Sequence, residues 1–242
     1  HIPIDQEAEL APIIRRVAAR GGVIVIPAFA IGRAQALMLH IARLLERNDI
    51  PAVPVFLNSP MAINATRHYH AHHSEHHVSE EDCQRMFDVA TFVNTVEESK
   101  ALNRQRGPMI IISASGMATG GRVLHHIEAF GPDDRNAIPL AGYQAGGTRG
   151  AALAAGKRTL RMFGREVPIR AEVVQLEGFS GHADAGELLD WMRTAPSAPR
   201  VVYLTHGEPD AADTLRGRVQ RELGWRARVP EHLERVGLED AR

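Results

Sequence analysis

The chain has 242 residues, of which 44% are hydrophobic and 24% charged, the composition of an ordinary globular protein with a sizeable core. Its formal net charge of −1 excludes a global positive field that would attract nucleic acid, so any basic surface must be local. The single cysteine, Cys83, excludes an internal disulfide framework and fits a reducing cytosol, and no apolar run approaches the roughly 18 residues that span a bilayer. We therefore expect a cytoplasmic protein with no membrane partner.

The first two thirds of the chain alternate short apolar runs with helical segments. Helices are expected over residues 6–19 and 33–47. The expected strands are continuous apolar runs, as in strands buried on both faces of a sheet, at residues 23–26, 53–57, 109–112 and 137–140. This alternation predicts an α/β fold with a mostly parallel sheet and helices on both faces.

The last third of the chain has a different pattern of expected helices and strands. Residues 159–163 and 170–176 are spaced like antiparallel strands around a turn at 164–166. Two further helices alternate with two further strands, in the order 185–192, 201–204, 210–223 and 226–229. We therefore place a domain boundary near residue 158, which divides the chain into residues 1–157 and 158–242.

Three loops of mainly small residues follow strands of the first domain. In the loop at 113–122, small residues let backbone N–H groups approach an anion, and the following helix adds its positive end. The other two loops lie at 58–61 and 141–148. Carboxyl ends of parallel strands meet at one edge, so the three loops would hold a phosphodiester chain there without reading its bases. A tight connection between strand and helix explains the same composition.

The candidate substrate-binding residues lie in these loops or at the helix starts beside them. They are Arg33, Ser59, Ser113, Ser115, Gly116, Gly120, Gly121, Arg122, Tyr143 and Gln144. Arg33 and Arg122 each stand near a helix start, where a guanidinium can reach a phosphate; for Arg33, a surface role is the alternative. Only 5% of the residues are aromatic, which argues against base-by-base reading of a single strand.

Two histidines stand beside glycines with a carboxylate two residues later. His182 lies in the string Gly-Phe-Ser-Gly-His-Ala-Asp at 178–184, and His206 in Leu-Thr-His-Gly-Glu at 204–208. A histidine in such a loop can reach a ligand while a nearby carboxylate sets its tautomer, so the two form a candidate metal and catalytic pair. Each is also explained as an ordinary turn residue.

A third group of histidines spans residues 68–77. Its first residues have the spacing H-x-H-x-D-H of a zinc motif, with His72 in place of the aspartate. The segment follows an apparently helical stretch and leads into polar residues, whereas the zinc motif should leave a buried strand. We interpret the group as a solvated surface that binds metal only adventitiously.

Taken together, these strings resemble the β-CASP family of metallo-β-lactamase-fold nucleases, in its RNA-processing branch related to the cleavage and polyadenylation nuclease subunit. The matching strings run in family order, at 26–35, 58–62, 113–122, 142–148, 179–184 and 205–208. The resemblance implies a parallel-sheet β-CASP domain over 1–157, followed over 158–242 by the C-terminal segment of a metallo-β-lactamase αββα domain. Asn58 departs from the family pattern, because many relatives carry aspartate there.

The resemblance also implies roles. His182 matches the family's catalytic histidine, which assists the leaving group, and His206 matches a metal ligand. Family members that act on DNA tend to lack the second histidine, which favours RNA as the partner. The family's other zinc ligands belong upstream of the matched region, and the chain opens at His1 without an initiator methionine. We therefore expect a C-terminal fragment without the N-terminal lactamase half, which is inactive alone and holds none of the two zinc ions of the complete enzyme.

The leading hypothesis is the RNA-binding and active-site-completing portion of a zinc-dependent ribonuclease that hydrolyses phosphodiester bonds. The alternative is a non-catalytic nucleic-acid-binding subunit of the same fold, although such a subunit has no chemical need of His182 and His206. A small-molecule hydrolase of the lactamase fold should lack the first α/β domain. The missing half should leave an exposed apolar face on part of residues 158–242. A second copy of the chain would cover this face in a homodimer, or the region would be mobile.

Overall fold

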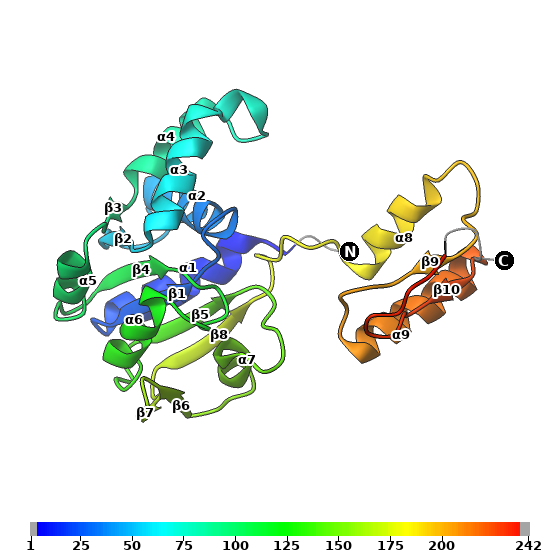
Figure 1. The fold of residues 1–242 in the computed structure, drawn as a ribbon. Coiled ribbons are helices and arrows are strands. Elements are labelled where there is room, and N and C mark those ends of the chain that lie inside the picture. The colour runs from blue at the N-terminus through cyan, green and yellow to red at the C-terminus, as the bar shows by residue number, and fades with distance from the viewer. Residues whose placement is uncertain (1–3, 238–242) are drawn as a thin grey trace. The chain divides into compact units, whose positions relative to one another are not determined.

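The computed structural model describes residues 4–237, which form two compact units that divide after Gly181. The larger unit is built around one sheet, and the smaller unit begins at His182 (Figure 1). Within residues 4–237, no helix is both long and apolar enough to cross a bilayer.

The central sheet of the larger unit has six strands, and every pairing in it is parallel. Their spatial order is β3 (Thr91–Phe92), β2 (Val55–Leu57), β4 (Met109–Ser113), β1 (Val23–Pro27), β5 (Ala137–Ala141) and β8 (Glu172–Leu176). β1 and β4 lie at the centre and are buried along their whole length, as their unbroken apolar sequences predict. The expected α/β fold with a parallel sheet is therefore confirmed.

Two hydrophobic layers cover the two faces of this sheet, because successive side chains of a strand point to opposite faces. Ile24 and Ile26 of β1 pack with helices α1 (Gln6–Ala19), α2 (Arg33–Glu46), α3 (Pro60–Ala71) and α4 (Glu80–Asp88). Val23 and Val25 pack in the other layer. That layer is formed by α5 (Val96–Leu102), α6 (Arg122–Phe130), α7 (Arg149–Ala154) and the hairpin of β6 (Thr159–Met162) and β7 (Arg165–Pro168).

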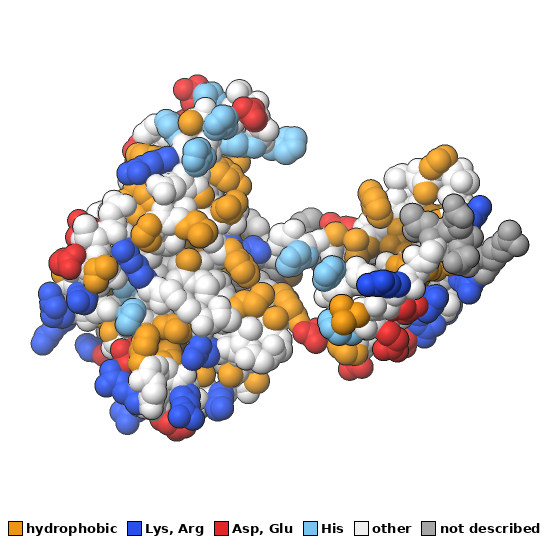
Figure 2. All heavy atoms as spheres, in the orientation of Figure 1, with side chains coloured by type: hydrophobic (Ala, Val, Ile, Leu, Met, Phe, Trp, Pro, Cys, Tyr) orange, Lys and Arg blue, Asp and Glu red, His pale blue; other side chains and the backbone are white. Residues whose placement is uncertain are grey.

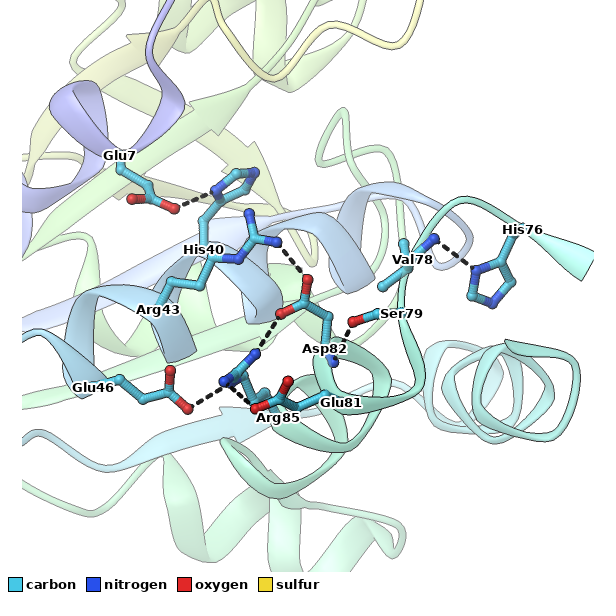
Figure 3. A network of polar contacts seen from close by, with 10 residues as sticks. All are labelled: Glu7, His40, Arg43, Glu46, His76, Val78, Ser79, Glu81, Asp82 and Arg85. Carbon is cyan, nitrogen blue, oxygen red and sulfur yellow. Dashed lines mark hydrogen bonds and ion pairs between the residues drawn. The ribbon is translucent and has the colours of Figure 1, made fainter. Parts of the chain in front are cut away.

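A chain of ion pairs fastens α4 to α2 (Figure 3). Asp82 accepts from Arg43 at 2.5 Å and from Arg85 at 3.0 Å, and Arg85 also binds Glu46 at 2.7 Å. Burial alone would raise the pKa of Asp82, but the hydrogen bonds from Arg43 and Arg85 outweigh it and lower that pKa. The helical projection formed by α3 and α4 is thereby anchored at its base.

The expected antiparallel pairing of residues 159–163 with 170–176 is wrong. β6 pairs with β7 instead, through a two-residue turn at Phe163 and Gly164, whose φ angles of +50° and +79° allow the chain to reverse at once. β8 then joins the central sheet, parallel to β5 along all five residues. This pairing keeps β8 in the larger unit and explains why the units divide after Gly181, whereas the domain boundary at 157/158 stays a prediction.

The smaller unit contains α8 (Ala185–Arg193), the parallel pair β9 (Val202–Tyr203) and β10 (Ala227–Arg228), α9 (Pro209–Arg218) and a wider helical turn at Val219–Leu223. Its small core is formed by Leu189, Val219 and Ala227, with partly buried neighbours. Asp184 caps α8 by accepting from the backbone N–H groups of Gly186 and Glu187.

Candidate nucleic-acid interface

The loops singled out in the sequence lie together at the carboxyl edge of the central sheet. The backbone N–H groups of Ala28 and Asn58 donate to Ser113 and Ile112 at the end of β4, at 3.0 and 2.9 Å. The Ser113 hydroxyl in turn donates to the Asn58 carbonyl oxygen at 2.8 Å. The first residues after β1, β2 and β4 are thus held side by side.

The loop after β4 is folded tightly on itself. The Ser115 hydroxyl oxygen accepts from the backbone N–H groups of Thr119 at 3.0 Å and Gly120 at 3.3 Å. Gly121 has φ +77°, and a Cβ there would lie 2.6 Å from the Ala114 carbonyl oxygen. A Cβ on Gly116 would lie 2.8 Å from the Phe29 ring, so the loop after β1 packs directly against this one. These glycines are required by close backbone approach.

The loop after β5 closes the edge from the other side. Gln144 donates its side-chain amide to the Gly116 carbonyl oxygen at 3.2 Å, and the Gly150 N–H donates to Met117 at 3.0 Å. A Cβ on Gly150 would approach the Gln144 side-chain oxygen to 1.7 Å, so a larger residue there would displace the Gln144 amide. Tyr143 is exposed beside it.

Arg33 places a cation at this edge. Its side chain is half-buried, and its Nε has no hydrogen-bond partner among residues 4–237. Burial lowers the pKa of the Arg33 guanidinium, because desolvation disfavours the charged form. A Cβ built on Gly142 or Gly181 would lie 3.3 or 3.7 Å from its Nη2, so two glycines leave open space around the charge.

Arg122 lies at the start of α6 and is held by neutral oxygens. Its Nη1 donates to the Asn58 side-chain oxygen at 2.8 Å and to the Val93 carbonyl at 3.1 Å. Its Nη2 donates to the Asn94 carbonyl at 2.7 Å. Three of its five N–H groups therefore anchor the loops after β2 and β3, and the other two stay available to a ligand.

Arg122 is connected through Asn58 to a buried polar network that the sequence did not predict. His126 is 0% exposed. Its Nε2 accepts from the Asn58 amide at 2.6 Å, and its Nδ1 donates to the Asn103 side-chain oxygen at 2.5 Å. Burial, with smaller effects of His125 and Arg122, lowers the pKa of His126 to about 4, so the ring is neutral at pH 7. The i, i+4 spacing of Arg122 and His126 on one helix was the available signal.

His182 and His206 both belong to the smaller unit, whereas the three loops, Arg33 and Arg122 belong to the larger one. His182 is exposed two residues before the α8 cap, and His206 is exposed after β9 with φ +66°. The roles of His182 and His206 as a metal and catalytic pair therefore stay a prediction.

A zinc site is not complete in the described residues. Within residues 4–237, no three His, Cys, Asp or Glu side chains lie together as metal ligands. One imidazole such as that of His206 cannot supply the four-coordinate shell that zinc requires, so the residues present do not by themselves fit the metal.

The histidine-rich segment at 68–77 forms the end of α3 and a following short turn. His76 is engaged in local structure, with its Nδ1 accepting from the Val78 N–H at 3.3 Å (Figure 3) and its Nε2 3.0 Å from the Tyr69 carbonyl oxygen. His72 contacts Glu75 at 2.8 Å on the exposed surface. His72 thus lies on the surface, whereas His70 and His76 are half-buried, and the interpretation of the whole segment as a solvated surface stays a prediction.

Comparison with known proteins agrees with this architecture. Residues 34–153 match the family model of the Beta-Casp domain, and residues 166–230 match that of the Zn-dependent metallo-hydrolase RNA specificity domain. The chain is similar to a ribonuclease of Thermus thermophilus, with 39% identity over 84% of this chain and 47% of the relative. It is also similar to the transcription termination factors FttA of Methanosarcina mazei and Pyrococcus abyssi, each with 31% identity over 97% of this chain and 38% of the relative.

The chain thus belongs to the β-CASP family of metallo-β-lactamase-fold nucleases, as the sequence strings indicated. It carries the family's β-CASP domain and a domain of the zinc-dependent metallo-hydrolase class. It spans about half or less of the length of these curated relatives.

Proposed function

We propose that the carboxyl edge of the larger unit binds the phosphodiester backbone of RNA. The observation that supports this most directly is Arg33, a half-buried guanidinium whose Nε has no acceptor within residues 4–237. A desolvated cation without a counter-charge is costly to the fold, and a phosphate would compensate it. The names of the relatives, a ribonuclease and transcription termination factors, support RNA as the ligand.

Around Arg33, the loops would supply the remaining contacts. Arg122 keeps two N–H groups for a phosphate oxygen, and the loop of Ser115, Gly116, Gly120 and Gly121 presents backbone at the start of α6. Ser113 and Gln144 hold the loops in place through the contacts described above, and Tyr143 is exposed beside them. The Ser59 hydroxyl caps α3 by accepting from the Ala62 N–H at 3.2 Å. Such a site grips the RNA backbone without selecting bases.

We further propose that the chain is the RNA-binding and active-site-completing part of a zinc-dependent ribonuclease that acts in the cytoplasm. His182 would protonate the leaving oxygen, and His206 would be one zinc ligand. The other ligands would then come from outside residues 4–237, because that part of the chain holds no three-ligand group. A homodimer is proposed as the oligomeric state.

The test measures binding of a short single-stranded RNA by the 242-residue chain over a range of salt concentrations. Arg33→Ala should weaken binding and reduce the salt slope by about one, because one phosphate contact is lost. Arg135→Ala is the matched control, since Arg135 is exposed and paired with Asp133 in a loop before β5. If Arg33→Ala binds like the parent chain, the proposed site is wrong.

An RNA-cleavage assay distinguishes the catalytic residues from the residues that only bind RNA. In a longer protein that also carries the family's H-x-H-x-D-H segment, His182→Ala and His206→Ala should each abolish RNA cleavage while RNA binding persists. Binding without cleavage in that unmodified protein would favour the non-catalytic subunit.

A further inference from the structure

The tip of the β6–β7 hairpin carries an unusual residue for its conformation. The turn consists of Phe163 and Gly164, both with positive φ, which is the type I′ geometry that favours Asn-Gly or Asp-Gly. A bulky side chain at φ +50° is sterically disfavoured, and Phe163 is nevertheless 52% exposed. An aromatic side chain kept at a strained, exposed position motivates a search for a function.

The ring of Phe163 is held in place by a stacking contact. It stacks on the exposed imidazole of His125, with ring centroids 4.4 Å apart and planes 11° from parallel. His125 lies three residues after Arg122 on α6, about one helical turn from the loop at the carboxyl edge. The two rings therefore form a rigid aromatic surface next to the proposed RNA site.

Arg149 connects the hairpin to the loop after β4. Arg149 donates from Nε to the Arg161 carbonyl at 2.9 Å and from Nη1 to the Thr119 carbonyl at 3.3 Å, which ties β6 to that loop. Figure 2 shows Lys and Arg side chains gathered around the hairpin, α6 and α7, with hydrophobic side chains among them.

The arginines of the hairpin lie beside acidic residues. Arg165 is paired with Glu128 of α6, from Nε at 2.9 Å. Glu166 lies opposite Arg161 in the hairpin register, but the Arg161 guanidinium makes no hydrogen bond or ion pair within residues 4–237. An exposed, unpaired guanidinium two residues from an exposed ring suits a nucleotide, whose base can stack while its phosphate is neutralised.

We propose that Phe163 and His125 form a stacking platform for one unpaired base of RNA, and that Arg161 contacts the adjoining phosphate. This rests on the proposed function, because it extends the RNA path from the carboxyl edge along α6 to the hairpin. The occupant is single-stranded, since a base within a duplex does not present its face. Stacking accepts every base, so the platform adds affinity without sequence preference.

The test uses a fluorescent oligoadenylate of twelve nucleotides and an abasic oligomer of the same length and charge, each titrated with the 242-residue chain. Phe163→Asn is the main variant, because asparagine suits the positive φ of the turn and the hairpin should stay folded. It should weaken oligoadenylate binding about tenfold with an unchanged salt slope, and leave abasic binding as in the parent chain. Phe163→Trp is the matched control and should retain binding.

Arg161→Ala gives the complementary result. It should weaken both oligomers and lower the salt slope by about one, because the contact it removes is ionic. Equal binding of oligoadenylate by the parent chain and Phe163→Asn, with circular dichroism showing both folded, would overturn the platform. If the parent chain binds neither oligomer, the proposed RNA site fails as well, and the two failures are thereby distinguished.

Discussion

Replacement of His126 by glutamine should change how the stability of the larger unit depends on pH. His126 is buried and neutral in the folded chain, where its pKa is about 4, whereas an exposed histidine in the unfolded chain titrates near 6.5. Below pH 6.5 the unfolded state therefore binds a proton that the folded state does not, and stability falls as the pH falls. Glutamine does not titrate, so His126→Gln should lose this dependence while it still accepts from Asn58 and donates to Asn103.

The magnitude follows from the two pKa values. Between pH 7 and pH 5, His126 should cost the folded state about 2 kcal/mol, and the effect should level off near about 3 kcal/mol once the pH passes below the folded pKa. Carboxylates that also titrate in this range are the same in both proteins. Their contribution cancels when the two unfolding free energies are subtracted.

Urea unfolding of both proteins at pH 7, 6 and 5, followed by far-ultraviolet circular dichroism, measures this difference. The parent chain should lose about 2 kcal/mol more than His126→Gln between the first and last pH. An NMR titration gives the pKa directly, since the His126 resonance is the one missing from the variant. A constant difference in unfolding free energy, or a His126 pKa near 6.5, would refute the buried neutral network.

Two further predictions concern Arg122 and the metal. Arg122→Ala should weaken RNA binding and flatten its salt dependence. An unchanged salt slope would mean that Arg122 does not contact RNA and only anchors the loops through its three hydrogen bonds. The purified 242-residue chain should bind no stoichiometric zinc through His206 and should not cleave RNA, because one imidazole does not make a zinc site. Metal analysis and a cleavage assay check this, and chelator-sensitive cleavage would contradict it.

The sheet was predictable because its strands have a strong local signal. β1, β4 and β5 are continuous apolar runs bounded by glycine or polar residues, and such runs are typical of parallel strands buried on both faces. The position of the loops then followed from topology alone, because parallel strands end at one edge.

The hairpin was not predictable for an equally local reason. Its turn is Phe163-Gly164, which lacks the Asn-Gly or Asp-Gly pair that marks a type I′ turn. The turn was therefore expected at 164–166, and the returning strand at 170–176 instead of Arg165–Pro168. Once that turn was missed, β8 was assigned to the wrong partner.

The candidate site was predictable in position but not in its contacts. Small residues and a nearby arginine indicated an anion site after β4, yet the sequence does not say which oxygens occupy an arginine. That Arg122 is held by Asn58, and Asn58 by His126, depends on tertiary packing between β2, α6 and the loop after α5. Residues distant in sequence leave no periodic pattern, so such networks are found only in the folded chain.

The arginines at the carboxyl edge differ from several others in the larger unit. Some of those others are paired with carboxylates, as in the pairs of Arg43 with Asp82 and Arg165 with Glu128. At the edge, Arg33 makes no ion pair within residues 4–237, and Arg122 is held by amide and carbonyl oxygens alone. Asn58 is central to this difference.

Asn58 stands where the resemblance to the family leads us to expect aspartate. An aspartate at that position would place a negative charge against Arg122 and draw a proton onto His126, whereas asparagine makes the same contacts without charge. The neutral pair of Asn58 and His126 therefore holds Arg122 in place through uncharged partners. Arg33 and Arg122 thus lie at one edge without an ion pair within residues 4–237, which supports the proposal that a polyanion binds there.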